Sequence, residues 1–151
     1  MLDRFEQFSS FISGIYRSIQ KLEREEMVKF GLKGAYAQYL VVMNRRNEGI
    51  TSAELGEICE KDKAAVSRIV AEMEEKGLLT RVAPGGNLYR AQLFLTDKGT
   101  EAAQFVARRA QIAVEKAGEG LNDADRSRFY SALGLISSNL QDICKQGIGE
   151  E

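Results

Sequence analysis

The sequence predicts a mainly α-helical chain that carries one small β-hairpin. Apolar residues recur at steps of three and four through most of the 151 residues, which places them on one face of a helix. Only residues 78–95 alternate between apolar and polar side chains, and Pro84-Gly85-Gly86-Asn87 forms a turn signal in the middle of that stretch. Helices therefore precede and follow a single two-stranded ribbon.

The first two helices are predicted from their apolar steps and from the glycines that follow them. A long helix runs from the N-terminus to Phe30, where Gly31 ends it, and a second covers about residues 33–46. The apolar positions of the first helix form a heptad seam, at Phe5, Phe8, Ile12, Ile15, Ile19 and Leu22. Those of the second helix are Tyr36, Tyr39, Leu40 and Met43.

Two short helices are expected next, each with a capping residue at its start. Thr51 and Glu54 have the spacing of a capping box, so the third helix begins there, and we expect it to bury Leu55, Ile58 and Cys59. Asp62 is a good N-cap for the fourth helix, which ends at Gly77. The buried face of the fourth helix is predicted at Val66, Ile69, Val70 and Met73.

The hairpin and the last two helices complete the predicted order. Residues 78–82 are expected to form the first strand and residues 88–95 the returning strand. Thr96 caps a fifth helix that reaches about Ala117, and Asn122 caps a sixth. The apolar seam of the sixth helix again alternates steps of four and three, at Phe129, Leu133, Ile136, Leu140 and Ile143.

Two short helices joined by a tight turn and followed directly by a glycine-tipped hairpin are the plan of a winged helix-turn-helix. The second helix of such a pair enters the major groove of DNA with its N-terminal residues. Between Lys61 and Ala71 there are three cations, Lys61, Lys63 and Arg68, and a single carboxylate, Asp62. The acids Glu72, Glu74 and Glu75 stand at the other end of the helix, away from the expected phosphates. This segregation of charge favours a DNA-reading helix over an ordinary solvated face.

Residue types at these positions suggest individual roles in contacting a double-stranded DNA partner. Arginine and lysine donate to guanine edges or phosphates, serine to either, and alanine permits close approach or contact with a thymine methyl group. In the hairpin, arginine suits the narrow minor groove, although glycines there also serve turn geometry alone. The predicted DNA-binding residues are Thr51, Ser52, Lys61, Lys63, Ala64, Ala65, Ser67, Arg68, Arg81, Asn87 and Arg90.

From about Leu32 to Gly99 the sequence resembles the MarR family of bacterial regulators. The resemblance rests on the order and spacing of four segments: Thr51-Ser52-Ala53-Glu54-Leu55, Val66-Ser67-Arg68-Ile69-Val70, Met73-Glu74-Glu75-Lys76-Gly77-Leu78-Leu79-Thr80-Arg81, and Leu95-Thr96-Asp97-Lys98-Gly99. It implies a dimeric transcriptional regulator, a repressor by expectation, whose two winged domains read a pseudo-palindromic operator and are often released by a small ligand.

The first and last helices are predicted to form a homodimer interface, because their seams are more apolar than one small domain requires. We expect residues 1–31 and 97–146 to form the dimerisation region and residues 32–96 the winged helix-turn-helix. The alternative is that the seams pack only on each other within one subunit. The predicted interface residues are Phe5, Phe8, Ile12, Ile15, Phe129, Leu133, Ile136, Leu140 and Ile143.

A ligand site is implied by the resemblance, since small aromatic compounds often bind between the dimer region and the winged domain in that family. Tyr16, Tyr36, Tyr39 and Met43 are the candidates for lining it, and a role in the core is the alternative reading of the same residues. Cys59 is expected to be a small buried hydrophobe and Cys144 to be accessible, and neither is expected to act as a redox sensor.

Composition excludes several other classes of function. Histidine is absent and no phosphate-binding glycine loop precedes a helix, so we expect no enzyme, no cofactor and no metal site. No apolar run is long enough to form a signal peptide or a membrane span, which indicates a cytoplasmic protein with no membrane partner. The net charge of -1 leaves a winged-helix protein–protein adaptor without DNA binding as the main alternative to a regulator.

Overall fold

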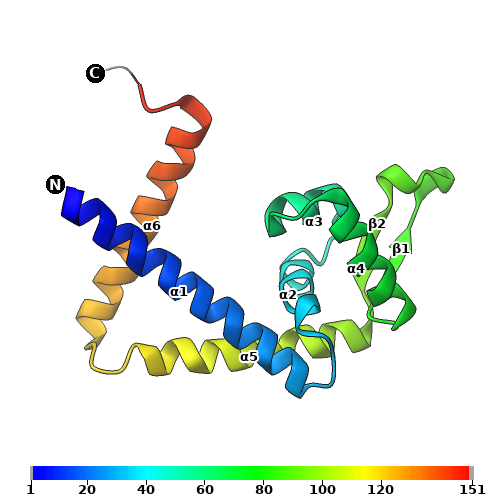
Figure 1. Cartoon of the computed structure of the whole chain (residues 1–151), viewed down its shortest axis with the longest axis horizontal. Coiled ribbons are helices and arrows are strands. Elements are labelled where there is room, and N and C mark those ends of the chain that lie inside the picture. Colours follow the sequence, from blue (N-terminus) through cyan, green and yellow to red (C-terminus); the bar gives the residue numbers. More distant parts are fainter. Residues whose placement is uncertain (1, 150–151) are drawn as a thin grey trace. The chain divides into compact units, whose positions relative to one another are not determined.

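The computed structural model describes residues 2–149 and consists of helices with one small antiparallel hairpin (Figure 1). The fold class predicted from the sequence is therefore confirmed. Met1, the first residue of the predicted segment 1–31, lies outside the described residues. The helices are α1 (Leu2–Lys29), α2 (Ala37–Arg45), α3 (Ser52–Cys59), α4 (Lys63–Glu75), α5 (Asp97–Ala117) and α6 (Asp123–Gln146).

The predicted helix starts are confirmed by their hydrogen bonds. In the capping box of α3, the Thr51 hydroxyl accepts from the Glu54 amide at 3.2 Å while the Glu54 carboxylate accepts from the Thr51 amide at 2.8 Å. The Asp62 carboxylate accepts from the Ala65 amide at 2.8 Å and begins α4. Asn122 caps α6 in the same way, through the Asp125 amide. These side chains satisfy backbone donors that a helix start leaves unpaired.

The second helix begins later than its apolar pattern indicates. A 3₁₀ turn occupies Gly34–Tyr36, and the regular helix α2 starts only at Ala37. Lys33 precedes the turn and has no side-chain oxygen to accept a backbone amide, so the first turn tightens into i to i+3 bonding. This turn leaves the Tyr36 side chain fully buried.

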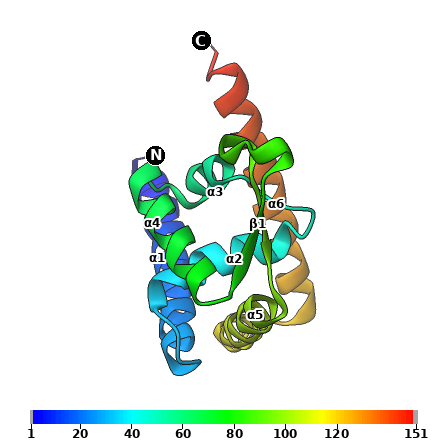
Figure 2. The same ribbon diagram turned by 90° about the vertical axis from the view of Figure 1, so that its right-hand side faces the viewer.

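The hairpin is shorter than predicted, because its returning strand begins four residues late. Strand β1 (Leu79–Val82) pairs with β2 (Gln92–Leu95) in the hairpin that Figure 2 shows. Leu79 lies opposite Leu95 and Val82 opposite Gln92. Two 3₁₀ turns occupy Pro84–Gly86 and Leu88–Arg90, where the sequence predicted strand from residue 88. Leu88 is exposed, so the apolar residue that extended the alternating pattern has no core to face.

The chain divides into two units, Met1–Ala113 and Val114–Glu151, so the division falls within α5. The first unit holds the core, built from the end of α1, from α2, α3, α4, the hairpin and the first half of α5. Leu55, Cys59, Val66, Val70 and Met73 are buried as predicted, but Ile69 is only partly buried. The expectation for Ile58 is wrong: it is exposed, because Leu55 and Cys59 define the packed face of α3 and Ile58 lies off it.

The second unit is dominated by α6, a helix of 24 residues of which none is buried. Its start is held by the Asn122 cap and by Arg126, whose guanidinium donates to the Gly118 carbonyl at 3.1 Å. In residues 2–149, no helix combines the length and the apolar character that crossing a membrane would require.

Candidate nucleic-acid interface

Helix α4 presents one face to the core and the opposite face to solvent. Val66, Val70 and Met73 are buried, and they hold the helix against α3 and the hairpin. Five side chains of α4 were predicted to reach DNA, and four of them are exposed on the outer face: Lys63, Ala64, Ser67 and Arg68. Burial of these side chains would have excluded a DNA-reading role for α4, so their exposure keeps that prediction in place.

Charge is segregated along α4 as the sequence indicated, and the structure shows what happens to the acids. Asp62, at the cationic end, is used as the N-cap. Further along, the Glu72 carboxylate accepts from Lys33 at 2.8 Å and from the Tyr36 hydroxyl at 3.0 Å. The Lys33 ammonium lowers the pKa of Glu72, so this group is a carboxylate at neutral pH. The N-terminal half of α4 thus combines cations with the positive end of the helix dipole.

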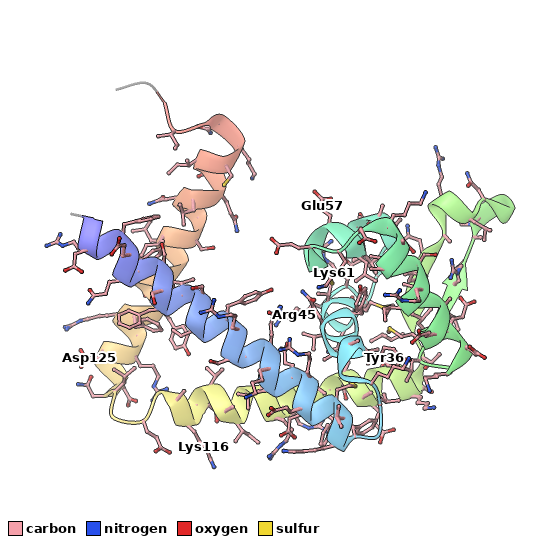
Figure 3. All side chains as sticks on the ribbon, viewed as in Figure 1. Tyr36, Arg45, Glu57, Lys61, Lys116 and Asp125 are labelled. Atoms are coloured by element: carbon pink, nitrogen blue, oxygen red, sulfur yellow. The ribbon has the colours of Figure 1, made fainter. Side chains whose placement is uncertain are left out.

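The start of α3 and the turn before α4 hold three more of the predicted DNA-binding residues. The Thr51 hydroxyl is engaged in the capping box, where it also donates to Glu54 at 2.9 Å, and Ser52 is the first residue of the helix. Glu60 has a φ of 53°, in the left-handed region, and turns the chain sharply so that exposed Lys61 leads into α4 (Figure 3). Ala65 is partly buried beside it.

The three residues of the hairpin that were predicted to bind DNA, Arg81, Asn87 and Arg90, have different positions in the structure. Arg81 on β1 makes an ion pair with Glu74 of α4, with Nε 3.0 Å from Oε2, so the structure gives it a bond between wing and helix. Asn87 and Arg90 lie in the exposed turns at the tip. Of the three, these two residues have the position that a contact with a DNA backbone or minor groove requires.

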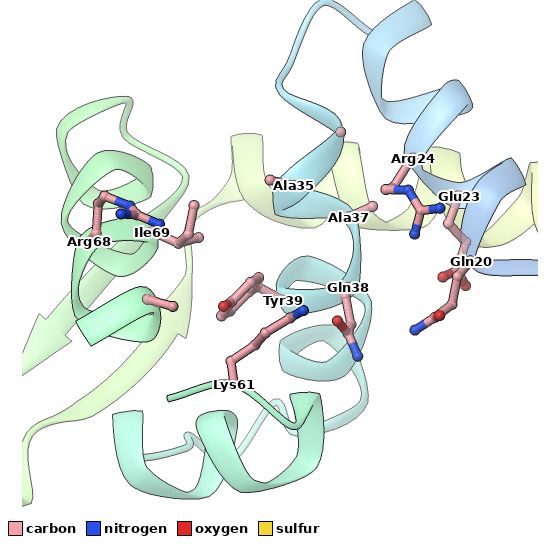
Figure 4. A pocket seen from close by; sticks show the side chains of 12 residues that line it. Gln20, Glu23, Arg24, Ala35, Ala37, Gln38, Tyr39, Lys61, Arg68 and Ile69 are labelled. Atoms are coloured by element: carbon pink, nitrogen blue, oxygen red, sulfur yellow. The ribbon is translucent and has the colours of Figure 1, made fainter. Parts of the chain in front are cut away.

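A cavity of about 310 Å³ lies beside this surface, and every residue that lines it belongs to the first unit (Figure 4). Three cationic side chains reach it from three elements: Arg24 from α1, Lys61 from the turn before α4, and Arg68 from α4 itself. Among the residues that the structure describes, none of these three cations makes a side-chain hydrogen bond or ion pair. The other residues that line the cavity are Gln20, Glu23, Gly34, Ala35, Ala37, Gln38, Tyr39, Ala65 and Ile69.

The four residues predicted to line a ligand site do not meet in one place. Tyr39 borders the cavity, but Tyr36 and Met43 are buried in the core and are not among its lining residues. Tyr16 is exposed on α1, where its hydroxyl accepts from Gln20. The prediction and the structure differ because residue type does not reveal burial. An aromatic side chain can fill the core or border a cavity, and the sequence alone does not distinguish the two.

Sequence reasoning missed Arg24, Gln38, Lys33 and the pairing of Glu72. Arg24 and Gln38 stand on helices whose sequence signal is an apolar face, and nothing in the spacing of the two residues points to a cavity formed with α4. Lys33 and Glu72 are 39 residues apart, so no local pattern pairs them. The sequence does carry one signal for Glu72: it stands four residues after Arg68, and residues at that spacing share a helix face and can pair.

The two cysteines have the environments that the sequence predicted. Cys59 is buried in the core, and desolvation raises the pKa of its thiol to about 11. Cys144 is exposed on α6. A buried thiol with a raised pKa is almost wholly protonated at neutral pH, which makes it a poor nucleophile toward peroxide. In the described residues, no cluster of histidine, cysteine or acidic side chains suits a metal ion.

Comparison with known proteins identifies the fold's relatives. A family model described as MarR family matches residues 30–87, which span α2, both short helices and the first strand of the hairpin. The match covers the winged-helix segment and not the outer helices. The match confirms, for this segment, the resemblance to MarR regulators that the sequence shows.

Solved MarR-family structures share the fold over nearly the whole chain. A MarR transcriptional regulator from Methanosarcina mazei Go1 matches with a TM-score of 0.75 at 22% identity, covering 91% of this chain and 92% of the other. A MarR family regulator from Listeria monocytogenes, solved with a 26mer DNA, matches with a TM-score of 0.70 at 24% identity, covering 94% and 96%. Identities of 22% and 24% are low, so the likeness shows a shared fold and nothing more. Because it covers 91% and 94% of this chain, the shared fold includes the outer helices.

A curated relative from Thauera aromatica is named as a transcriptional regulatory protein for the hcr operon. It is 25% identical over 100 residues, which are 66% of this chain. The chain spans 59% of that relative's length.

Proposed function

We propose that this chain regulates transcription by binding double-stranded DNA, with α4 in the major groove and the hairpin tip against the neighbouring backbone. One observation carries the proposal: the outer face of α4 exposes Lys63, Ser67 and Arg68, while the acids Glu72 and Glu74 are engaged by cations of the same unit. A helix that shows cations at its N-terminal end, and whose acids Glu72 and Glu74 are paired with cations from other segments, suits a polyanion. The MarR-family relative solved with a 26mer DNA supports the same reading.

A salt titration with random-sequence duplex DNA tests this proposal against a winged-helix adaptor that binds only protein. The affinity of a DNA-binding protein falls steeply as salt rises, since each phosphate contact releases condensed counterions. For roughly six to ten contacts, the loss is about a thousandfold or more between 50 and 200 mM salt. An adaptor would show almost no binding at low salt, and that result would overturn the proposal.

We further propose that two copies act together as a repressor on a pseudo-palindromic operator. One winged helix reads too few base pairs for high specificity, and two-fold symmetry pairs two such readers. The outer helices supply the means. On α1, the seam residues Phe5, Phe8, Ile12 and Ile15 are all exposed. On α6, Phe129, Ile136, Leu140 and Ile143 are exposed and Leu133 is partly so. Apolar stripes of this kind are covered by a partner in stable proteins.

Replacing Leu140 with glutamate is expected to convert the dimer into monomers at micromolar concentration. Leu140 lies within the apolar stripe of α6 and is 48% exposed, so the change leaves the core of its own subunit intact. A buried, unpaired carboxylate at the interface costs about 3 kcal/mol or more. Sedimentation equilibrium measures the result. Ser138→Glu is the matched control, because it adds the same charge to the opposite side of the helix and should leave the dimer unchanged. A wild-type chain that sediments as a monomer would contradict the dimer.

We also propose that the cavity beside α4 binds a small aromatic anion that releases the DNA. Its volume lies at the lower end of the range for small-molecule sites. Three cations and one carboxylate, Glu23, line it together with the Tyr39 ring and four apolar side chains, and burial raises the pKa of Glu23. Lys61 and Arg68 belong to both the cavity and the DNA surface, so an anion bound there competes with DNA for the same two cations.

Arg24→Ala is expected to weaken ligand release without weakening DNA binding. Arg24 lines the cavity from α1 and lies outside the DNA surface defined by α4 and the hairpin tip. With benzoate as the probe, the concentration that releases half the DNA should rise about tenfold, the usual effect of losing one charge-assisted hydrogen bond. Competition fluorescence anisotropy measures it. If benzoate releases DNA from Arg24→Ala and from the wild type at equal concentrations, the cavity is not the site through which the anion acts.

A further inference from the structure

The carboxylate of Glu72 stands one helical turn from Arg68, a cation of the proposed DNA surface of α4. Residues four apart on a helix lie close enough for their side chains to pair, so Arg68 and Glu72 form a potential ion pair within α4. That pair does not form. In the described part of the chain Arg68 makes no ion pair, whereas Glu72 is bound to two groups from the segment between α1 and α2.

The two groups that hold Glu72 come from the same turn. The Lys33 ammonium lies 2.8 Å from Oε2 of Glu72, and the Tyr36 hydroxyl donates to that same oxygen at 3.0 Å. Lys33 also stands over the Tyr36 ring, 6.0 Å from its centroid. The hydrogen bond to Glu72 raises the pKa of Lys33, while Lys33 lowers that of Glu72, so both groups stay charged at neutral pH.

We propose that Lys33 and Tyr36 are positioning residues for DNA binding: by occupying the Glu72 carboxylate, they keep it from capturing Arg68 and so leave Arg68 available to nucleic acid. This inference rests on the proposed function, because it presumes that Arg68 contacts DNA. Tyr36 cannot make such a contact itself, since its side chain is fully buried. Lys33 is exposed, and its role must therefore be separated from a direct phosphate contact by experiment.

The test measures how the cost of Lys33→Met depends on Glu72 and on Arg68. In the wild-type background, the change should weaken operator binding about two- to fivefold, the effect of one i, i+4 ion pair formed in each of two half-sites. In a Glu72→Gln background the loss should disappear, because no carboxylate remains to capture Arg68. In an Arg68→Ala background it should disappear as well. Fluorescence anisotropy with one operator duplex serves for every variant.

Three further variants keep the result interpretable. Lys33→Arg retains the ion pair and should retain affinity. Tyr36→Phe, a buried change, should cause a smaller loss in the same direction. Lys29→Met is the matched charge control, because Lys29 neutralises a different carboxylate, Glu26, at 2.7 Å, and its loss should leave DNA affinity unchanged. Thermal unfolding checks that each variant is folded.

The outcomes separate the inference from the function beneath it. Equal losses from Lys33→Met in the wild-type and Glu72→Gln backgrounds would mean that Lys33 contacts phosphate directly, and would overturn the inference. So would the absence of any loss in the wild type. If Arg68→Ala itself leaves DNA affinity unchanged, the assignment of Arg68 to the DNA surface fails instead.

Discussion

Replacing Arg68 with alanine is expected to lower operator affinity by about a hundredfold, because each half-site loses a contact of 1–3 kcal/mol and the dimer carries two. The side chain is exposed on the outer face of α4, and in the described residues no acid is paired with it. Its loss therefore removes an interaction with DNA and leaves the fold intact. Anisotropy titrations over a range of salt concentrations measure both the affinity and its salt slope.

Arg68→Lys distinguishes base reading from phosphate binding at this position. Lysine keeps the charge but lacks the planar fork that contacts guanine at two atoms. If Arg68 reads a base, the lysine variant loses specificity nearly as much as the alanine variant does. If Arg68 binds phosphate, lysine restores most of the affinity, and the alanine variant instead shows a shallower salt slope. Arg108→Ala, an exposed cation of α5 outside the winged-helix segment, is the control and should bind DNA like the wild type.

Local patterns predicted the fold well, because each helix carries its own start signal and its own period. Thr51, Asp62 and Asn122 were recognisable as caps, and all three accept the expected backbone amides. The outer face of α4 followed from the buried one, since a helix with Val66, Val70 and Met73 inward must turn Arg68 outward. These features depend on residues within one or two turns of each other.

The parts that were missed depend on contacts between segments distant in sequence. The partners of Glu72 lie on another element, more than thirty residues away, and the cavity combines α1, α2 and α4. The wing was misjudged at Leu88, where an apolar residue continued an alternating pattern without a core to face. A sequence pattern gives the direction of a side chain relative to its own helix or strand, but not what another segment places against it.

Gly99→Ala is expected to destabilise the protein more than any other single methyl addition at its glycines, because the new Cβ would overlap the carbonyl oxygen of Leu78. That carbonyl cannot move away easily. Its oxygen accepts from the Thr96 amide at 3.1 Å, and the Leu78 amide donates to Met73 at 2.9 Å. Leu78 is also fully buried, between the end of α4 and the first strand. Relief therefore requires α5 to shift away from the hairpin.

The expected loss follows from two opposing contributions. Overpacking against fixed backbone costs about 3 kcal/mol, while alanine gains about 1 kcal/mol over glycine in helix propensity. The free energy of unfolding should fall by about 2 kcal/mol and the melting temperature by roughly 4–8 °C. Gly134→Ala is the matched control: a Cβ there meets nothing within 4 Å and points away from the apolar stripe of α6, so propensity alone acts and the melting temperature should rise slightly. Calorimetry that finds both variants stabilised would show that α5 and the hairpin are not packed as closely as the Leu78–Gly99 contact requires.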